Sequence, residues 1–180
     1  MTILTSDQWD SFIVQNPDAH LLQTTSWGRL KEQFGWSVVR ISTGELGAQI
    51  LFRSLSPGVN IAYIPKGPVG LSRPDMPEFA QFCKEADLIC KKRHAFLLKI
   101  EPDAWRSESP LEMQAFYDHP LVEPIFDDSR LPNMRISQHS IQPLRTILVN
   151  LEEGEEQILS RMKQKTRYNI RLAQRLEVKV

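Results

Sequence analysis

The sequence predicts a mixed α/β (α+β) fold in which a largely antiparallel sheet is flanked by helices. The segments at 36–42, 46–55 and 59–65 are predicted to be strands, and the turn sequences "TGE" and "SPG" separate them, which is typical of successive hairpins. A further segment, "AFLLKIEP" at 95–102, is apolar enough for a central strand. The content of 41% hydrophobic and 24% charged residues is typical of a soluble globular protein.

Helices are expected around these strands. After a short strand at "TIL", Ser6 is expected to cap a helix in which Trp9 and Phe12 share one face. A second helix is expected over residues 26–34, and Gly35 is placed to end it.

A third and longer helix is expected between the last two strands. Pro74 and Pro77 open it, and it runs to about Arg93, with Phe79, Phe82, Ala86 and Ile89 on one face.

A second series of elements begins after the less regular residues 103–142. We expect a strand at "LRTILVNL" (144–151), helices at "EEGEEQILSRMK" and "TRYNIRLAQRL", and the start of a strand at "EVKV". This order repeats the start of the first series, so we expect a first domain at 1–142 and the first elements of a second domain at 143–180. A repeat that stops at its second strand leaves an apolar face without a partner, so we expect the chain to be part of a longer protein. A terminal arm that packs back onto the first domain is the alternative.

Composition argues against several classes of protein and site. No apolar run is long enough to span a bilayer, and the N-terminus lacks the pattern of a signal peptide, so a cytoplasmic location is expected. Cys83 and Cys90 lie in an expected helix at a separation of roughly 10 Å, too far for a disulfide, so we expect reduced thiols. The histidines and cysteines show no metal-ligand spacing, so we expect no metal site.

Positive charge is concentrated at the end of a chain whose formal net charge is zero. Residues 161–180 carry seven Lys and Arg and one acid. In the expected last helix, Lys163, Arg167, Arg171 and Arg175 recur every four residues and would form one basic stripe. Like charges at this spacing destabilise a helix, and the stripe suits phosphate groups on RNA or on a nucleotide-linked substrate. A solvated basic face whose aliphatic stems cover the core is the alternative.

Two other stretches hold candidate binding residues. In "QTTSWGRLKEQFGW" (23–36), Lys31 follows Trp27 by one helical turn, and Gly28 indicates the close approach of another backbone or a ligand. In "IAYIPKGPVG" (61–70), Tyr63 and Lys66 lie where a strand ends in a rigid turn, and ligands often meet α/β sheets at strand ends. A core-packing helix with an exposed lysine and a stiff connector are the alternative interpretations.

No motif identifies catalytic residues, which stay unknown at this stage. The chain lacks a G-x-S-x-G motif, a P-loop and a G-x-G-x-x-G motif, and neither cysteine has an evident base. Glu101, in "KIEP", is a candidate for a buried carboxylate with a shifted pKa. The residues alone therefore predict an α/β domain with an anion-binding basic stripe.

Four stretches, in order, resemble the FemABX family of aminoacyltransferases, which build peptidoglycan interpeptide bridges. They are "LLQTTSWGRLKEQFGW", "AYIPKGPV", "LLKIEP" and "IQPLRTILVNLEEGEEQILSRMKQKTRYNIRLA". The resemblance is to the N-terminal portion of that family and covers most of residues 8–180, with 103–135 matched poorly. It implies two GNAT-like acyltransferase domains, the first at 1–142 and the second begun at 143–180.

The resemblance also implies a reaction and its partners. The family transfers an amino acid from aminoacyl-tRNA to a stem-peptide amine of a peptidoglycan precursor, either UDP-MurNAc-pentapeptide or lipid II, in cell-wall biogenesis. No metal or organic cofactor is implied, and we expect a cytoplasmic monomer that meets the membrane only through a membrane-linked substrate. The family's residues for the chemical step lie mainly in the second domain, so we expect this chain alone to be inactive.

The resemblance assigns roles to some residues. Lys31 would contact the precursor's pyrophosphate, and Arg167 and Arg171 in "TRYNIR" would face phosphate groups or tRNA. Trp27 is expected beside Lys31, and the Tyr63–Lys66 stretch completes the candidate substrate-binding set.

One departure and two alternative functions bear on these expectations. The family commonly has Gly where this chain has Glu177, and a positive φ there would cost glutamate about 1 kcal/mol. A GNAT-type N-acetyltransferase would need a glycine-rich pyrophosphate loop (Q/R-x-x-G-x-G/A), which the sequence lacks. A non-catalytic module that binds tRNA or the precursor is the other alternative.

Overall fold

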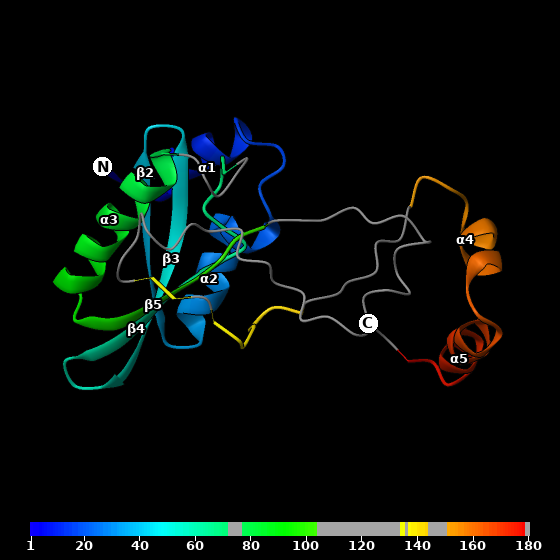
Figure 1. The fold of residues 1–180 in the computed structure, drawn as a ribbon. Coiled ribbons are helices and arrows are strands. Elements are labelled where there is room, and N and C mark those ends of the chain that lie inside the picture. Colours follow the sequence, from blue (N-terminus) through cyan, green and yellow to red (C-terminus); the bar gives the residue numbers. More distant parts are fainter. Residues whose placement is uncertain (72–76, 104–133, 136, 144–150, 179–180) are drawn as a thin grey trace. The chain divides into compact units, whose positions relative to one another are not determined.

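The computed structural model describes residues 1–71, 77–103, 134–135, 137–143 and 151–178 (Figure 1). The chain divides into two compact units, 1–142 and 143–180. The elements of the first unit are, in order, β1 (Thr2–Leu4), α1 (Ser6–Val14), the 3-10 helix η1 (Leu21–Gln23), α2 (Thr25–Gln33), β2 (Trp36–Thr43), β3 (Leu46–Ser56), β4 (Val59–Pro65), α3 (Pro77–Lys92) and β5 (Ala95–Glu101). Apart from η1, which the sequence did not predict, this order of elements is the one expected from the sequence.

The five strands form one mixed sheet in the order β1-β2-β3-β4-β5. The first four strands pair antiparallel, and β5 pairs parallel to β4 after the α3 crossover. The predicted fold class, a largely antiparallel sheet flanked by helices, is therefore confirmed. The expectation that 95–102 forms a central strand is wrong within the described residues, because β5 ends the strand order there and its Phe96 and Leu97 side chains are exposed.

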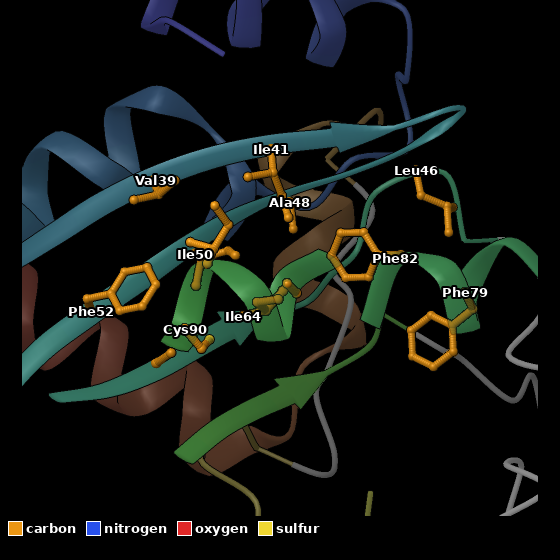
Figure 2. Close-up of a cluster of buried hydrophobic side chains, with 13 residues drawn as sticks. Val39, Ile41, Leu46, Ala48, Ile50, Phe52, Ile64, Phe79, Phe82 and Cys90 are labelled. Atoms are coloured by element: carbon orange, nitrogen blue, oxygen red, sulfur yellow. The ribbon is translucent and has the colours of Figure 1, made fainter. Parts of the chain in front are cut away.

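One face of the sheet is apolar and packs against α3. Alternate residues of β2, β3 and β4 point to this face, since side chains alternate along a strand. Figure 2 shows their side chains facing the aromatic rings of α3. The buried cluster is Val39, Ile41, Leu46, Ala48, Ile50, Phe52, Ala62, Ile64, Phe79, Phe82, Ala86, Ile89 and Cys90. The predicted buried face of the long helix is thus confirmed.

The opposite face of the sheet carries α1 and α2. Gly47 of β3 makes room for α1, because a Cβ there would lie 2.7 Å from the Phe12 ring and 2.9 Å from the Trp9 ring. The N-terminal cap of α1 is Thr5 and not the expected Ser6. The Thr5 hydroxyl accepts from Gln8 N–H and the Gln8 side chain accepts from Thr5 N–H, which completes a capping box.

The second unit contains two described helices, α4 (Glu155–Arg161) and α5 (Gln164–Arg175). Acidic Glu155 and Glu156 in the first turn of α4 suit the positive end of its dipole. The strand expected at 144–151 falls almost wholly outside the described residues. Leu176 and Glu177 form a turn after α5 where the strand was expected to start, and residues 179–180 of that expected start lie outside the described residues. That this unit begins a second GNAT-like domain stays a prediction.

Two local details concern thiols and membranes. Cys83 and Cys90 are free thiols of α3, and burial raises their pKa values to about 12 and about 11. Both thiols therefore stay protonated at neutral pH. Within the described ranges, no helix combines the length and hydropathy needed to cross a bilayer.

Candidate functional site

A buried polar network joins α2 to the sheet on the face opposite α3. The Gln23 side chain accepts from Gln49 N–H at 2.7 Å and donates to the Pro65 carbonyl at 2.6 Å. The Gln49 side chain donates to the Thr24 carbonyl at 2.9 Å and accepts from Arg40 Nε at 3.0 Å. Buried polar groups are costly unless they are paired, so this network fixes where α2 begins on the sheet.

Gly28 allows α2 to lie directly on this network. A Cβ at Gly28 would stand 2.4 Å from Gln49 Oε1 and 2.8 Å from Arg40 Nη2. The sequence correctly indicated a close approach at this glycine. The approaching groups are side chains of the sheet and not a backbone or a ligand.

Lys31 lies in the last turn of α2 between two indole rings. Its Nζ stands 5.0 Å from the centroid of Trp27 and 5.4 Å from that of Trp36, which are distances at which a cation is attracted to an aromatic ring. Among the described residues Lys31 makes no ion pair. The indole N–H of Trp27 is buried, and no described residue accepts a hydrogen bond from it. The structure thus brings together the two candidates of this stretch, with Trp36 as a third member.

Arg53 is a member of this group that sequence reasoning missed. It pairs across the hairpin with Trp36, and its guanidinium carbon lies 5.5 Å from the centroid of the Trp36 ring. Arg53 also makes no ion pair with a described residue. The sequence did contain a signal for this pairing. If the hairpin turns at Gly44 and Glu45, counting residues outward from the turn along both strands places Arg53 opposite Trp36.

Tyr63 and Glu101 form a second group, on β4 and β5. Tyr63 is buried, and its hydroxyl donates to Glu101 Oε2 at 2.5 Å and accepts from the Gln142 side chain at 3.0 Å. The Glu101 carboxylate also accepts from the backbone N–H groups of Ile141 and Gln142, at 2.6 and 3.0 Å. Lys99 lies 3.5 Å from the same carboxylate and donates to the carbonyl of His139. Glu101 therefore attaches the segment before the second unit to the end of β5.

The pKa values of this pair move in opposite directions. Burial, and then the hydrogen bond to the Glu101 carboxylate, raise the pKa of Tyr63 above its usual value, so its hydroxyl stays a donor. Burial alone would raise the pKa of Glu101. The hydrogen bonds from Tyr63, Ile141 and Gln142, with the Lys99 charge, outweigh burial and lower the Glu101 pKa. Glu101 is thus an ionised carboxylate with a shifted pKa.

Lys66 follows β4 with a backbone φ of 50°, in the left-handed region that most residues avoid. Its Nζ lies 3.2 Å from Asp103 Oδ1, and its side chain is only 14% exposed. The neighbouring Gly67 N–H donates to the Glu101 carbonyl at 3.2 Å. The expected rigid turn is therefore present, with its lysine bound to an acid.

The basic stripe lies in the second unit and differs in part from expectation. Lys163 is the extended N-cap of α5 and so does not extend the stripe along the helix. Arg167 donates to the carbonyls of Ser160 and Met162, at 3.0 and 2.8 Å, which ties α5 to the end of α4. Arg171 is exposed. An open groove along α5 is lined by Gln164, Arg167, Tyr168, Arg171, Gln174 and Arg175.

The structure thus brings the candidates together in three groups. Lys31 and Trp27 lie together over Trp36, while Tyr63 and Lys66 lie near the end of β4 with Glu101. Register places Tyr63 on the same sheet face as Trp36 and Arg53, since Arg53 and Leu51 face one way and Leu51 pairs with Tyr63. The third group is on α5. Within the described residues, no three His, Cys, Asp or Glu gather as metal ligands.

Comparisons with known proteins agree with this fold. The chain is 26% identical over 176 residues to a "Lipid II:glycine glycyltransferase" of Staphylococcus aureus (strain MRSA252), which covers 94% of the chain and 40% of that protein. It is 24% identical to the protein of the same name from Staphylococcus haemolyticus (strain JCSC1435), which covers 98% of the chain and 42% of that protein. The chain therefore spans about 40% of the length of these relatives.

Structural and family comparisons agree with these matches. A solved structure described as "Crystal structure of FemX" superposes with a TM-score of 0.61 at 22% identity and covers 96% of this chain and 43% of that one. This likeness shows the fold. The model of the FemAB family matches residues 4–180. With nearly its whole length matched, the chain belongs to the FemAB family.

Proposed function

We propose that this chain takes part in moving an amino acid from aminoacyl-tRNA to the stem-peptide amine of a peptidoglycan precursor. Family membership and the two relatives named "Lipid II:glycine glycyltransferase" support this. The structural observation that carries the proposal is the position of the Lys31 ammonium. It is held against the rings of Trp27 and Trp36 and makes no ion pair with a described residue.

Lys31 binds the diphosphate of the precursor in this proposal. Its side chain is already ordered by two rings, so binding an anion costs less side-chain entropy than it would for a free lysine. Trp27 holds the ammonium in place, and the buried network under Gly28 fixes the helix that presents it. This geometry supports a preformed anion site at the end of α2.

The remaining candidates have less direct roles in the proposal. The Tyr63 hydroxyl is used by Glu101 and Gln142, so Tyr63 contributes through its ring or by holding Glu101 in place. Lys66 presents its charge to substrate together with Asp103. Arg171, exposed on α5, faces phosphate groups of the precursor or of tRNA, and Arg167 holds the helix that carries it.

The reaction has a simple balance. The acceptor amine attacks the ester carbonyl of the aminoacyl-tRNA. A C–N bond forms, and the bond between the acyl carbon and the ribose oxygen breaks. The proton lost by the amine ends on the ribose oxygen. We assign no residue of this chain to that proton transfer.

Titration of UDP-MurNAc-pentapeptide into the chain and into Lys31→Ala tests the proposed site. Loss of a charge-assisted contact predicts about tenfold weaker binding or more. Lys84→Ala, which removes an exposed lysine from α3, is the matched control and should bind as the unaltered chain does. Equal affinities for all three proteins would remove Lys31 from the site.

The stripe on α5 is tested by salt dependence. If Arg171 contacts RNA phosphates, Arg171→Gln should lower the slope of log affinity against log salt for tRNA by about 0.7 to 0.9. Arg161→Gln is the control, since Arg161 is already paired with Glu153 at 2.6 Å. Identical slopes for the chain and Arg171→Gln would assign the stripe to the precursor or to neither ligand.

A non-catalytic binding module is the second candidate function. It is favoured by two observations on the described residues. The Lys31 group and the α5 group present positive charge, and the Glu101 carboxylate of the second group is already used by hydrogen bonds from Tyr63, Ile141 and Gln142. Incubation of the chain with aminoacyl-tRNA and precursor, followed by mass spectrometry of the precursor, tests the module. A mass increase of one aminoacyl residue would exclude a non-catalytic module, whereas binding without a mass increase agrees both with the module and with the expectation that this chain alone is inactive.

A further inference from the structure

Arg53 and Lys31 place two positive groups on one indole ring. The Lys31 ammonium lies 5.4 Å from the Trp36 ring centroid, and the Arg53 guanidinium carbon lies 5.5 Å from it. The two cations come from different elements, α2 and β3, so they reach the same ring only through the fold. This convergence is not visible in any contiguous motif.

No carboxylate of the described residues neutralises the two positive charges at this ring. Neither Lys31 nor Arg53 makes an ion pair in the part of the chain that the structure describes, although four other lysines and arginines there do. Two like charges held near one ring repel each other, and an anion that lies close to both offsets this repulsion. Such a pair of cations therefore favours a ligand that carries more than one negative charge.

The pairing of β2 with β3 holds the Arg53 side chain beside the Trp36 ring. Trp36 and Arg53 are directly opposite each other in the β2–β3 hairpin, where neighbouring side chains are closest. Arginine presents a planar fork of donors that matches phosphate oxygens in pairs, whereas lysine supplies a point charge. Arg53 and Lys31 would therefore contact a diphosphate in different ways, one as a fork and one as a point.

We infer that Arg53 is a second diphosphate-binding residue, which acts with Lys31 around Trp36. The inference rests on the proposed function and extends it by one residue and one ring. The ligand chemistry is a diphosphate, whether linked to uridine or to a lipid. Trp36 is the positioning residue, because it touches both cations.

The test measures diphosphate binding to the full chain and to Arg53→Ala. One arm uses UDP-MurNAc-pentapeptide in solution, and the other uses vesicles with and without lipid II. The diphosphate that binds the unaltered chain identifies the source. Arg53→Ala should weaken that binding about tenfold or more, and Arg53→Lys should recover part of the loss because it keeps the charge but not the fork.

Arg93→Ala is the matched control. Arg93 makes the same kind of contact, with its guanidinium carbon 5.4 Å from the Phe52 ring, on the α3 face of the sheet. Its removal should leave diphosphate binding unchanged. It also reports any loss of stability that comes from removing an arginine–aromatic contact.

The outcomes separate this inference from the proposed function. If Lys31→Ala weakens binding while Arg53→Ala behaves like Arg93→Ala, the role of Arg53 is overturned and the proposed site stands. If the unaltered chain binds neither diphosphate, both fall. If Arg53→Ala weakens only tRNA binding, Arg53 belongs to an RNA contact and this inference is wrong. Joint binding also predicts that the Lys31→Ala and Arg53→Ala losses are not additive in the double variant.

Discussion

The two faces of the sheet use the same strands for different purposes. Toward α3, β2 and β3 present Val39, Ile41 and Ile50, which are buried in an apolar cluster. Toward α1 and α2, the same two strands present Arg40 and Gln49, which alternate with the apolar residues along the chain and are buried in a hydrogen-bonded network. The period of two along each strand separates a face that stabilises the fold from a face that positions charged groups.

This difference shows where a binding site can form without loss of the core. Packing of the apolar face against α3 excludes water and supplies the hydrophobic core. The other face can therefore hold polar groups, whose positions are fixed by hydrogen bonds. Lys31 and Arg53 lie at the edge of that polar face, where the network stops and the side chains are accessible. The comparison predicts that changes on the two faces will have different kinds of effect.

The largest effect is expected from Phe82→Ala on the apolar face. Phe82 is fully buried between α3 and the sheet, and removing a buried phenyl ring costs about 3–5 kcal/mol of stability. Chemical denaturation of the variant measures it. Leu88→Ala on the same helix is the control, since Leu88 is 52% exposed and should change stability by less than about 0.5 kcal/mol. Similar losses for both would contradict the packing described.

Gly28→Ala tests the polar face. The new methyl group would meet Gln49 Oε1, which cannot move without breaking its bond to Arg40. Overpacking of this kind costs about 1–3 kcal/mol, and displacement of α2 should also weaken precursor binding through Lys31. Ser26→Ala, at an exposed position of α2, should change neither quantity. A more stable Gly28→Ala chain with full binding would show that α2 does not lie on the network as described.

A smaller effect is expected from acid at Glu101. The Glu101 pKa is lowered in the folded chain, so the contribution of the carboxylate is fully present above the unfolded value of about 4.5 and is lost as the pH falls through the lower folded pKa. NMR titration of the Ile141 and Gln142 amides should give a midpoint below 4.5. Glu101→Gln should cost about 1–2 kcal/mol at neutral pH and abolish the titration. A midpoint at or above the unfolded value would contradict the hydrogen bonds described.

The smallest effect is expected at Glu177, which belongs to the second unit and provides a reference. Its φ is 52°, and its N–H donates to the Gln174 carbonyl while Val178 N–H donates to that of Ala173, which together make a Schellman motif. Glu177→Gly should stabilise this helix end by about 0.5–1 kcal/mol, seen as slower amide exchange in α5. Gln174→Gly, inside the helix, should have the opposite sign. Faster exchange in Glu177→Gly would contradict the geometry.

Elements with a strong local period could be predicted from the sequence. The helical spacing of Phe79, Phe82 and Ala86 predicted α3 and its buried face, and the turns at 43–45 and 56–58 predicted the hairpins. The positive φ considered for Glu177 is also present. These features depend on residues close together in the chain, which is why local patterns predicted them.

Features that depend on distant residues were predicted only in part. Gly28 indicated a close contact, but its partners Arg40 and Gln49 come from strands that only the folded sheet brings beneath it. The central position expected of β5 was wrong in the described residues, because an apolar run does not reveal how many neighbours a strand has. Arg53 was overlooked because a single arginine in a strand has the same local pattern as any solvent-facing residue.

The most direct test of the central claim is an NMR titration of the indole N–H groups with UDP-MurNAc-pentapeptide. Trp27 and Trp36 flank Lys31, whereas the Trp9 N–H is buried and donates to the Gln23 carbonyl at 2.7 Å. The account predicts saturable shifts of the Trp27 and Trp36 signals, a constant Trp9 signal, and loss of the shifts in Lys31→Ala. Unchanged Trp27 and Trp36 signals at saturating precursor would contradict the claim that this face of the sheet binds it.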